Sequence, residues 1–149
     1  SVGSALPGIA GILLIVAAGG GFKQMLVDAG VGAVIGDLAK GSGLSPLILG
    51  WLIAVGIRLA TGSATVATIT AAGIVSPLAA GLDKPTLALL VLAVGAGSLF
   101  FSHVNDAGFW LVKEYFGLTI GQTIKSWSVM ETVISVAGLI FVLLFSLVV

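Results

Sequence analysis

Charged residues are so rare in this chain that five long stretches contain no Asp, Glu, Lys or Arg: 1–22, 41–57, 59–82, 85–105 and 132–149. Only 8% of the 149 residues are charged and 58% are hydrophobic, whereas a soluble domain carries about 25% charged residues. So few charges cannot cover the surface of a water-soluble domain of this size. The chain is therefore predicted to be an all-α, multi-pass membrane protein.

The kinds of polar residue exclude further classes of protein. Six basic and six acidic residues cancel, which leaves no basic surface for a nucleic acid. The absence of cysteine excludes disulfides and thiolate sites, and a single histidine makes a zinc site improbable. Ser63 and His103 lack the Gly-x-Ser-x-Gly context of a hydrolase nucleophile. We expect no enzyme, no cofactor, no metal and no nucleic-acid partner.

Charges, prolines and glycines divide the chain into five segments. Ser45-Pro46 is typical of a helix start, and Asp83-Lys84-Pro85 is typical of a turn. We predict a spanning helix at about 6–20 and an interfacial connecting helix at 22–40, broken near Gly30. A hairpin at 46–77, an interrupted helix at 86–116 and a final helix at 119–149 follow.

The hairpin has two arms that are each too short to cross a hydrocarbon core of about 30 Å. The second arm is expected to stop before Pro77. Such a pair predicts a re-entrant hairpin with its tip at 61–65, although two spanning helices joined by a surface loop would share the pattern. A tip starts a new half-helix whose unpaired N–H groups suit an anion. Thr61, Ser63 and Thr65 add hydroxyls there, unless those hydroxyls only bond to their own helices.

Arg58, the only arginine, lies one turn before this tip inside an apolar stretch. A charge within the membrane costs about 2.5 kcal/mol or more, so it usually has a partner. A guanidinium group suits a substrate carboxylate. A structural pair with an acid, or a side chain that extends to the membrane interface, would explain the residue equally well.

The second polar cluster, His103, Asn105 and Asp106, lies in the predicted break at 102–108. An interrupted helix at membrane depth is tolerated only beside protein or a water-filled cavity. Asn105 can donate to and accept from substrate hydroxyls, and Asp106 or His103 can carry a coupled proton. Alternatively, all three residues only satisfy the broken backbone.

Several of these stretches closely resemble the gluconate permease family: GSATVA at 62–67, AAGIV at 71–75 and SHVNDAGFW at 102–110. KEYFG at 113–117 and WSVMET at 127–132 extend the resemblance over essentially the whole chain. It implies the C-terminal third of a proton-coupled importer of sugar acids in the bacterial inner membrane.

The resemblance also implies a more distant relation to the ion transporters that include dicarboxylate carriers. These have two inverted repeats, each with a re-entrant hairpin and a broken helix. Their hairpin tips carry Ser-Asn-Thr, often to hold sodium, whereas this chain has Ser63-Ala64-Thr65. The missing Asn favours protons over sodium.

The sequence thus predicts one repeat of an inverted-repeat transporter that moves gluconate or a similar sugar acid inward with a proton. Its expected partners are membrane lipid and a preceding N-terminal repeat, and a homo-oligomer is left open. The alternatives are a carrier for another small hydroxy-acid or dicarboxylate, and a non-transporting membrane assembly subunit. The candidate residues are Arg58, Thr61, Ser63, Thr65 and Asn105 for the substrate, and Asp106 or His103 for the proton.

Overall fold

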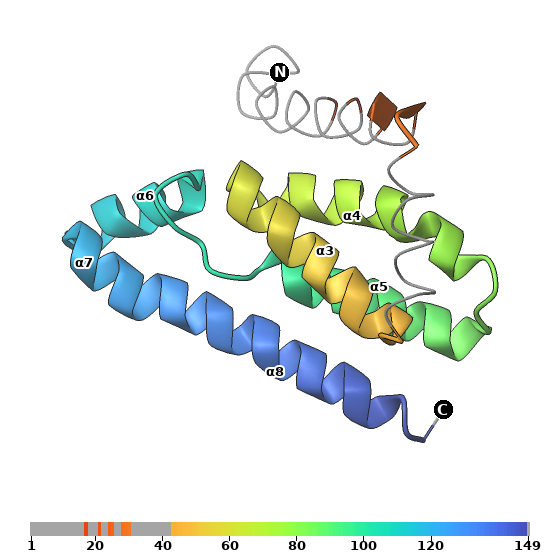
Figure 1. Ribbon diagram of the computed structural model, residues 1–149. Helices are drawn as coiled ribbons and strands as arrows, with labels where there is room; N and C mark the ends of the chain where they lie inside the picture. Colours follow the sequence, from red (N-terminus) through yellow and green to blue (C-terminus); the bar gives the residue numbers. More distant parts are fainter. Residues whose placement is uncertain (1–16, 18–20, 22–23, 26–27, 31–42, 149) are drawn as a thin grey trace, which may run out of the picture.

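The computed structural model describes residues 43–148 and, before them, only positions 17, 21, 24, 25 and 28–30. The helices predicted at about 6–20 and 22–40 therefore lie outside the described residues. The described part contains helices and no strand (Figure 1). The predicted all-helical class is confirmed.

Seven helical elements follow one another in the part of the chain that is described. Helices α3, α4 and α5 lie together, α8 runs along α5, and α6 lies near the start of α4 (Figure 1). The elements are α3 (Pro46–Thr61), α4 (Ala64–Ala79), α5 (Lys84–Ser98), α6 (Ala107–Tyr115), α7 (Ile120–Thr123), the π-helix η1 (Ile124–Ser128) and α8 (Val129–Phe145).

Helix α3 has a defined start and a defined end. At its start the Ser45 side chain accepts a hydrogen bond from the Leu47 N–H, with Pro46 in the first turn. At its end Gly62 takes a left-handed conformation, φ 66°, and donates its N–H to the Arg58 carbonyl. A side chain at position 62 would also collide with the Asn105 backbone. Gly62 therefore places the end of the first hairpin arm directly against the break between α5 and α6.

Small residues let the helices approach closely. Ala54, Ala71 and Ala93 are completely buried in the shared core, and a Cβ built on Gly97 would lie 2.5 Å from the Trp51 carbonyl oxygen. Without a hydrophobic driving force between helices in lipid, such close backbone contact is a main source of association. The α3–α5 contact is therefore a tight, fixed one.

Two helix ends differ from the sequence prediction. Helix α4 continues through Pro77 to Ala79, because a proline in the last turn removes only one backbone donor. Helix α5 ends at Ser98 rather than near Phe101. Phe101 has a left-handed backbone with φ 44°, which an α-helix cannot contain. The break is therefore longer on its N-terminal side than expected.

Elements α7, η1 and α8 form one continuous helix, Ile120–Phe145, of 26 residues, and the mean hydropathy of its most apolar 18-residue window is 2.2. It is the one described helix that is long and apolar enough to cross a membrane, and α3, α4 and α5 are apolar but shorter. Only 17% of its most apolar window is buried within the described structure. Ser135 on this helix accepts a hydrogen bond from the Trp51 indole at 3.1 Å, which joins α8 to α3.

Candidate functional site

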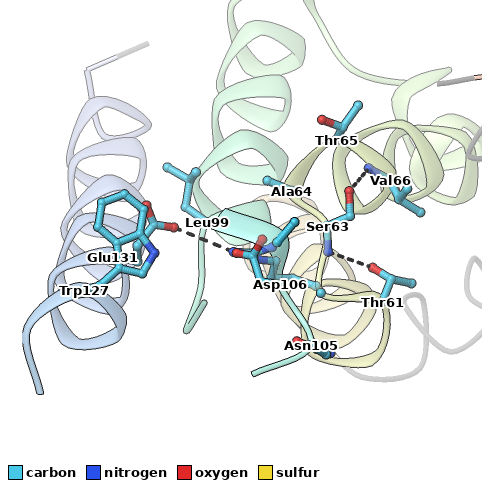
Figure 2. Close-up of a pocket in the computed structure, with 13 residues that line it drawn as sticks. Thr61, Ser63, Ala64, Thr65, Val66, Leu99, Asn105, Asp106, Trp127 and Glu131 are labelled. Carbon is cyan, nitrogen blue, oxygen red and sulfur yellow. Dashed lines mark hydrogen bonds and ion pairs between the residues drawn. The ribbon is translucent and has the colours of Figure 1, made fainter. Parts of the chain in front are cut away.

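The ends of the helices meet around an open cavity of about 510 Å³. Its lining comes from the hairpin tip, from both sides of the α5–α6 break and from the η1–α8 segment (Figure 2). The lining residues are Arg58, 61–66, Leu99, 105–107, Trp127 and Glu131. Polar groups of three separate chain segments are thus brought to one space.

Helix α4 begins directly after the turn at Gly62 and Ser63. Ser63 is the N-cap residue, and its hydroxyl accepts a hydrogen bond from the Val66 N–H at 3.3 Å. Thr61 donates its hydroxyl to the Ile57 carbonyl at 2.8 Å, whereas Thr65 is exposed and its hydroxyl bonds to no described residue. Two of the three hydroxyls therefore serve their own helices, and the N-terminal end of α4 faces the cavity.

Arg58 is buried, with a side chain only 3% exposed. Its Nη2 lies 2.5 Å from Asp106 Oδ2 and 3.9 Å from Glu131 Oε2. Its Nε is buried and has no hydrogen-bond partner among the described residues. The alternative of a structural pair with an acid is therefore present, and the buried Nε of the guanidinium has no partner in the described structure.

Asp106 is held from three directions. Its Oδ2 accepts hydrogen bonds from Arg58 and from the Ser102 hydroxyl, both at 2.5 Å. Its Oδ1 accepts from the Gly108 N–H at 2.8 Å and caps helix α6. All three partners donate, which suits an ionised carboxylate. Asp106 therefore connects the end of α3 to the start of α6.

Asn105 and His103 leave the break in different directions. The Asn105 amide donates to the Leu59 carbonyl at 2.9 Å, and Asn105 lines the cavity. The His103 Nδ1 instead lies 3.1 Å from the Phe101 carbonyl oxygen, and its ring packs on the Phe101 ring at 5.8 Å. The cavity therefore brings together Arg58, Thr61, Ser63, Thr65, Asn105 and Asp106 but not His103.

Trp127 and Glu131 complete the cavity and were not among the predicted site residues. The Trp127 indole donates to the Ser102 hydroxyl at 3.0 Å, and the Ser128 hydroxyl donates to the Ser102 carbonyl. Trp127 and Glu131 are four residues apart on one helix, a spacing that places side chains on the same face. That spacing, with an acid inside an apolar helix, was the available signal. The π-helix η1, which contains Trp127, had no sequence signature, although such turns often accompany functional sites.

Interrupted helices around a cavity lined in part by polar groups, in a chain otherwise so apolar, are typical of membrane transport proteins. The chain belongs to the GntP permease family, because a family model described as GntP family permease matches residues 1–148. The family is one of integral membrane permeases and not of enzymes. No solved structure gave a significant match.

Individual relatives agree with this assignment. The chain is 61% identical over 139 residues to a gluconate permease of Pseudomonas aeruginosa, covering 93% of this chain and 31% of the relative. It is 55% identical over 149 residues to a gluconate permease of Bacillus subtilis, covering 100% of this chain and 33% of the relative. It is 54% identical over 142 residues to the Gnt-II system L-idonate transporter of Escherichia coli, covering 95% and 32%. The chain thus spans about a third of the length of these relatives.

Proposed function

We propose that this chain forms part of a carrier that imports gluconate or a related sugar acid with a proton across the bacterial inner membrane. Relatives named for gluconate and for L-idonate support this substrate class. Both compounds are monocarboxylates with a row of hydroxyl groups. The cavity offers a cation, hydroxyls and an amide, which are the groups that such a molecule needs.

The observation that carries the proposal is the Arg58 side chain, which lines the cavity and whose buried Nε has no hydrogen-bond partner among the described residues. A substrate carboxylate would bind to this guanidinium and to the free N–H groups at the start of α4. Arg58 is the only basic residue among those that line the cavity in the described structure. One cation favours a monocarboxylate over a dicarboxylate. The substrate hydroxyls would bind Thr61, Ser63, Thr65 and Asn105.

The short helices support a transport cycle of the inverted-repeat type. Helix α3 has 16 residues and spans about 24 Å, less than the core of a bilayer. We therefore propose that α3 and α4 form a re-entrant hairpin and that α5 and α6 are the halves of a broken helix. Both would move against the rest of the carrier, with a preceding repeat of the same protein as the other half of the site.

The coupled proton would bind to an acid beside Arg58. Of the two residues that the sequence named, Asp106 lines the cavity and contacts Arg58. His103 lies outside the cavity lining. It remains a candidate only if the coupled proton reaches the cavity along the break. The geometry therefore favours the carboxylate cluster as the coupling site.

Uptake by proteoliposomes of the full-length protein tests the function. With an inward proton gradient, radiolabelled gluconate should accumulate above the external concentration and a protonophore should abolish that accumulation. L-Idonate should compete, and succinate should not. Uptake of succinate alone would indicate a dicarboxylate carrier, and no uptake of either would favour a non-transporting subunit.

A further inference from the structure

Glu131 on α8 is a second acid at the same guanidinium. Its side chain is 13% exposed and lines the cavity across from Asp106 (Figure 2). Its Oε2 is 3.9 Å from Arg58 Nη2, an ion pair without hydrogen-bond contact. Within the described structure Glu131 accepts no hydrogen bond. A mostly buried carboxylate in this position has little to stabilise its negative charge.

The two acids therefore differ in how well they are satisfied. Asp106 accepts from a guanidinium, a hydroxyl and a backbone N–H, all of which would be disturbed if it took up a proton. Glu131 would lose only a 3.9 Å attraction and would become a neutral group in an apolar helix. When two acids share one cation, a single proton belongs to the pair. The contacts place it on Glu131.

The charge of the cluster gives this proton a role. With both acids ionised, Arg58, Asp106 and Glu131 carry one net negative charge, which opposes the entry of an anionic substrate. One proton makes the cluster neutral and removes the competition of Glu131 for Arg58. The side of the guanidinium that faces Glu131 is then available to a carboxylate.

No further charged group competes for this proton among the described residues packed around Glu131. Arg58 faces it from α3 and Asp106 from the start of α6. Helix α5 packs on α8 and has no titratable residue after Lys84 at its opposite end. Lys125, on the same continuous helix, is exposed. His103 contacts the Phe101 carbonyl instead.

We propose that Glu131 holds the proton that travels with the substrate, while Asp106 stays ionised and anchors Arg58. This inference rests on the proposed sugar-acid symport and names the coupling residue within that site. One proton binds to the Glu131 carboxylate from the outside, and one substrate anion then binds to Arg58. Both are released inside, and Glu131 returns as a carboxylate. The cluster of the empty carrier therefore has one net negative charge, and the protonated cluster is neutral. Binding of the substrate anion restores one net negative charge.

The test compares Glu131→Gln with Glu114→Gln in the full-length protein. Glu114 is a matched control because its side chain is 72% exposed and pairs only with Lys113. In the wild type and in the control, gluconate affinity should fall about tenfold per pH unit once the proton site is empty. In Glu131→Gln the affinity should change less than about twofold over the same range. Gluconate exchange should continue, and accumulation driven by a pH gradient should be lost.

Each outcome has a defined meaning. If the wild type neither binds nor accumulates gluconate, the proposed function fails. If the wild type does both, and Glu131→Gln accumulates gluconate with an unchanged pH profile or loses exchange altogether, only the role of Glu131 is overturned. Glu131→Asp serves as a second variant should Glu131→Gln fail to fold. It keeps an acid but moves it away from Arg58, so the midpoint of the pH profile must shift, and an unchanged midpoint overturns the inference.

Discussion

Arg58 near the end of α3 and Asp106 at the start of α6 are joined at 2.5 Å although 48 positions separate them in the chain. The pair connects the hairpin tip to the broken helix, the two segments proposed to move during transport. Breaking a buried ion pair leaves an uncompensated charge and costs about 3–5 kcal/mol. Any substrate that draws Arg58 away from its acids therefore acts directly on the contact between these segments.

Replacing Arg58 by lysine should separate charge from geometry. Lysine keeps the positive charge but loses the planar fork that binds carboxylates through two donors. We expect gluconate affinity to fall by about 10- to 100-fold, the equivalent of roughly 1.5–3 kcal/mol for a charge-assisted hydrogen bond. Titration calorimetry on the purified protein measures this, with Lys125→Arg as the exposed control. Unchanged affinity in Arg58→Lys would remove Arg58 from the substrate site.

Gly62 should tolerate no side chain. Its φ of 66° disfavours any L-residue, and an added Cβ would meet the Asn105 backbone. We expect Gly62→Ala to destabilise the protein by about 1–3 kcal/mol and to lower its melting temperature and its uptake together. Gly56 is the matched control, because it lies exposed within α3 with no atom near an added Cβ. Gly56→Ala should be neutral or stabilising by up to about 1 kcal/mol, and equal melting temperatures of the two variants would contradict the proposed packing.

The hairpin tip should be sensitive to bulk. Ser63 caps α4 at the edge of the cavity, so Ser63→Leu removes the cap and fills the space before the helix N-terminus. We expect uptake to be abolished while membrane insertion, measured by membrane fractionation, stays intact. Ser76→Leu on the exposed side of the same helix is the control and should transport normally. Full transport by Ser63→Leu would mean that the tip is a plain surface loop.

The sequence indicated which residues gather at the cavity better than it indicated the helix ends. The polar tip at 61–65, the break at 102–108 and the isolated Arg58 each followed from a local rule about helix ends, breaks or charges in an apolar chain. The link between Arg58 and Asp106 depends on how α3 packs against the α5–α6 break, which no local pattern contains. Only the packing shows that Arg58 has a protein partner.

Glu131 and His103 illustrate the limits in opposite directions. Glu131 lies in the last apolar helix, far along the chain from the other site residues, and only the packing of α8 on α5 brings it to Arg58. His103 lies two residues from Asn105, yet its ring packs on Phe101. Because Phe101 has a left-handed backbone, the chain direction changes there in a way that helical periodicity does not predict. Neighbours in sequence were therefore a poor guide to neighbours in the cavity.

The roles of Asp106 and His103, both in the break, can be separated by Asp106→Asn and His103→Gln. Asp106→Asn keeps the shape of the side chain but removes the charge that anchors Arg58, leaving Glu131 as the remaining acid at the guanidinium. We expect Asp106→Asn to lose both gluconate exchange and accumulation driven by a pH gradient, because Arg58 would turn to Glu131 and away from the substrate. His103→Gln should keep both activities, since His103 lies outside the cavity lining. Uptake and counterflow in proteoliposomes measure the two activities separately.

If Asp106→Asn keeps exchange and loses only accumulation, then Asp106 itself carries the proton. If His103→Gln shows that pattern instead, the proton passes through the imidazole, and the carboxylates serve only to hold Arg58.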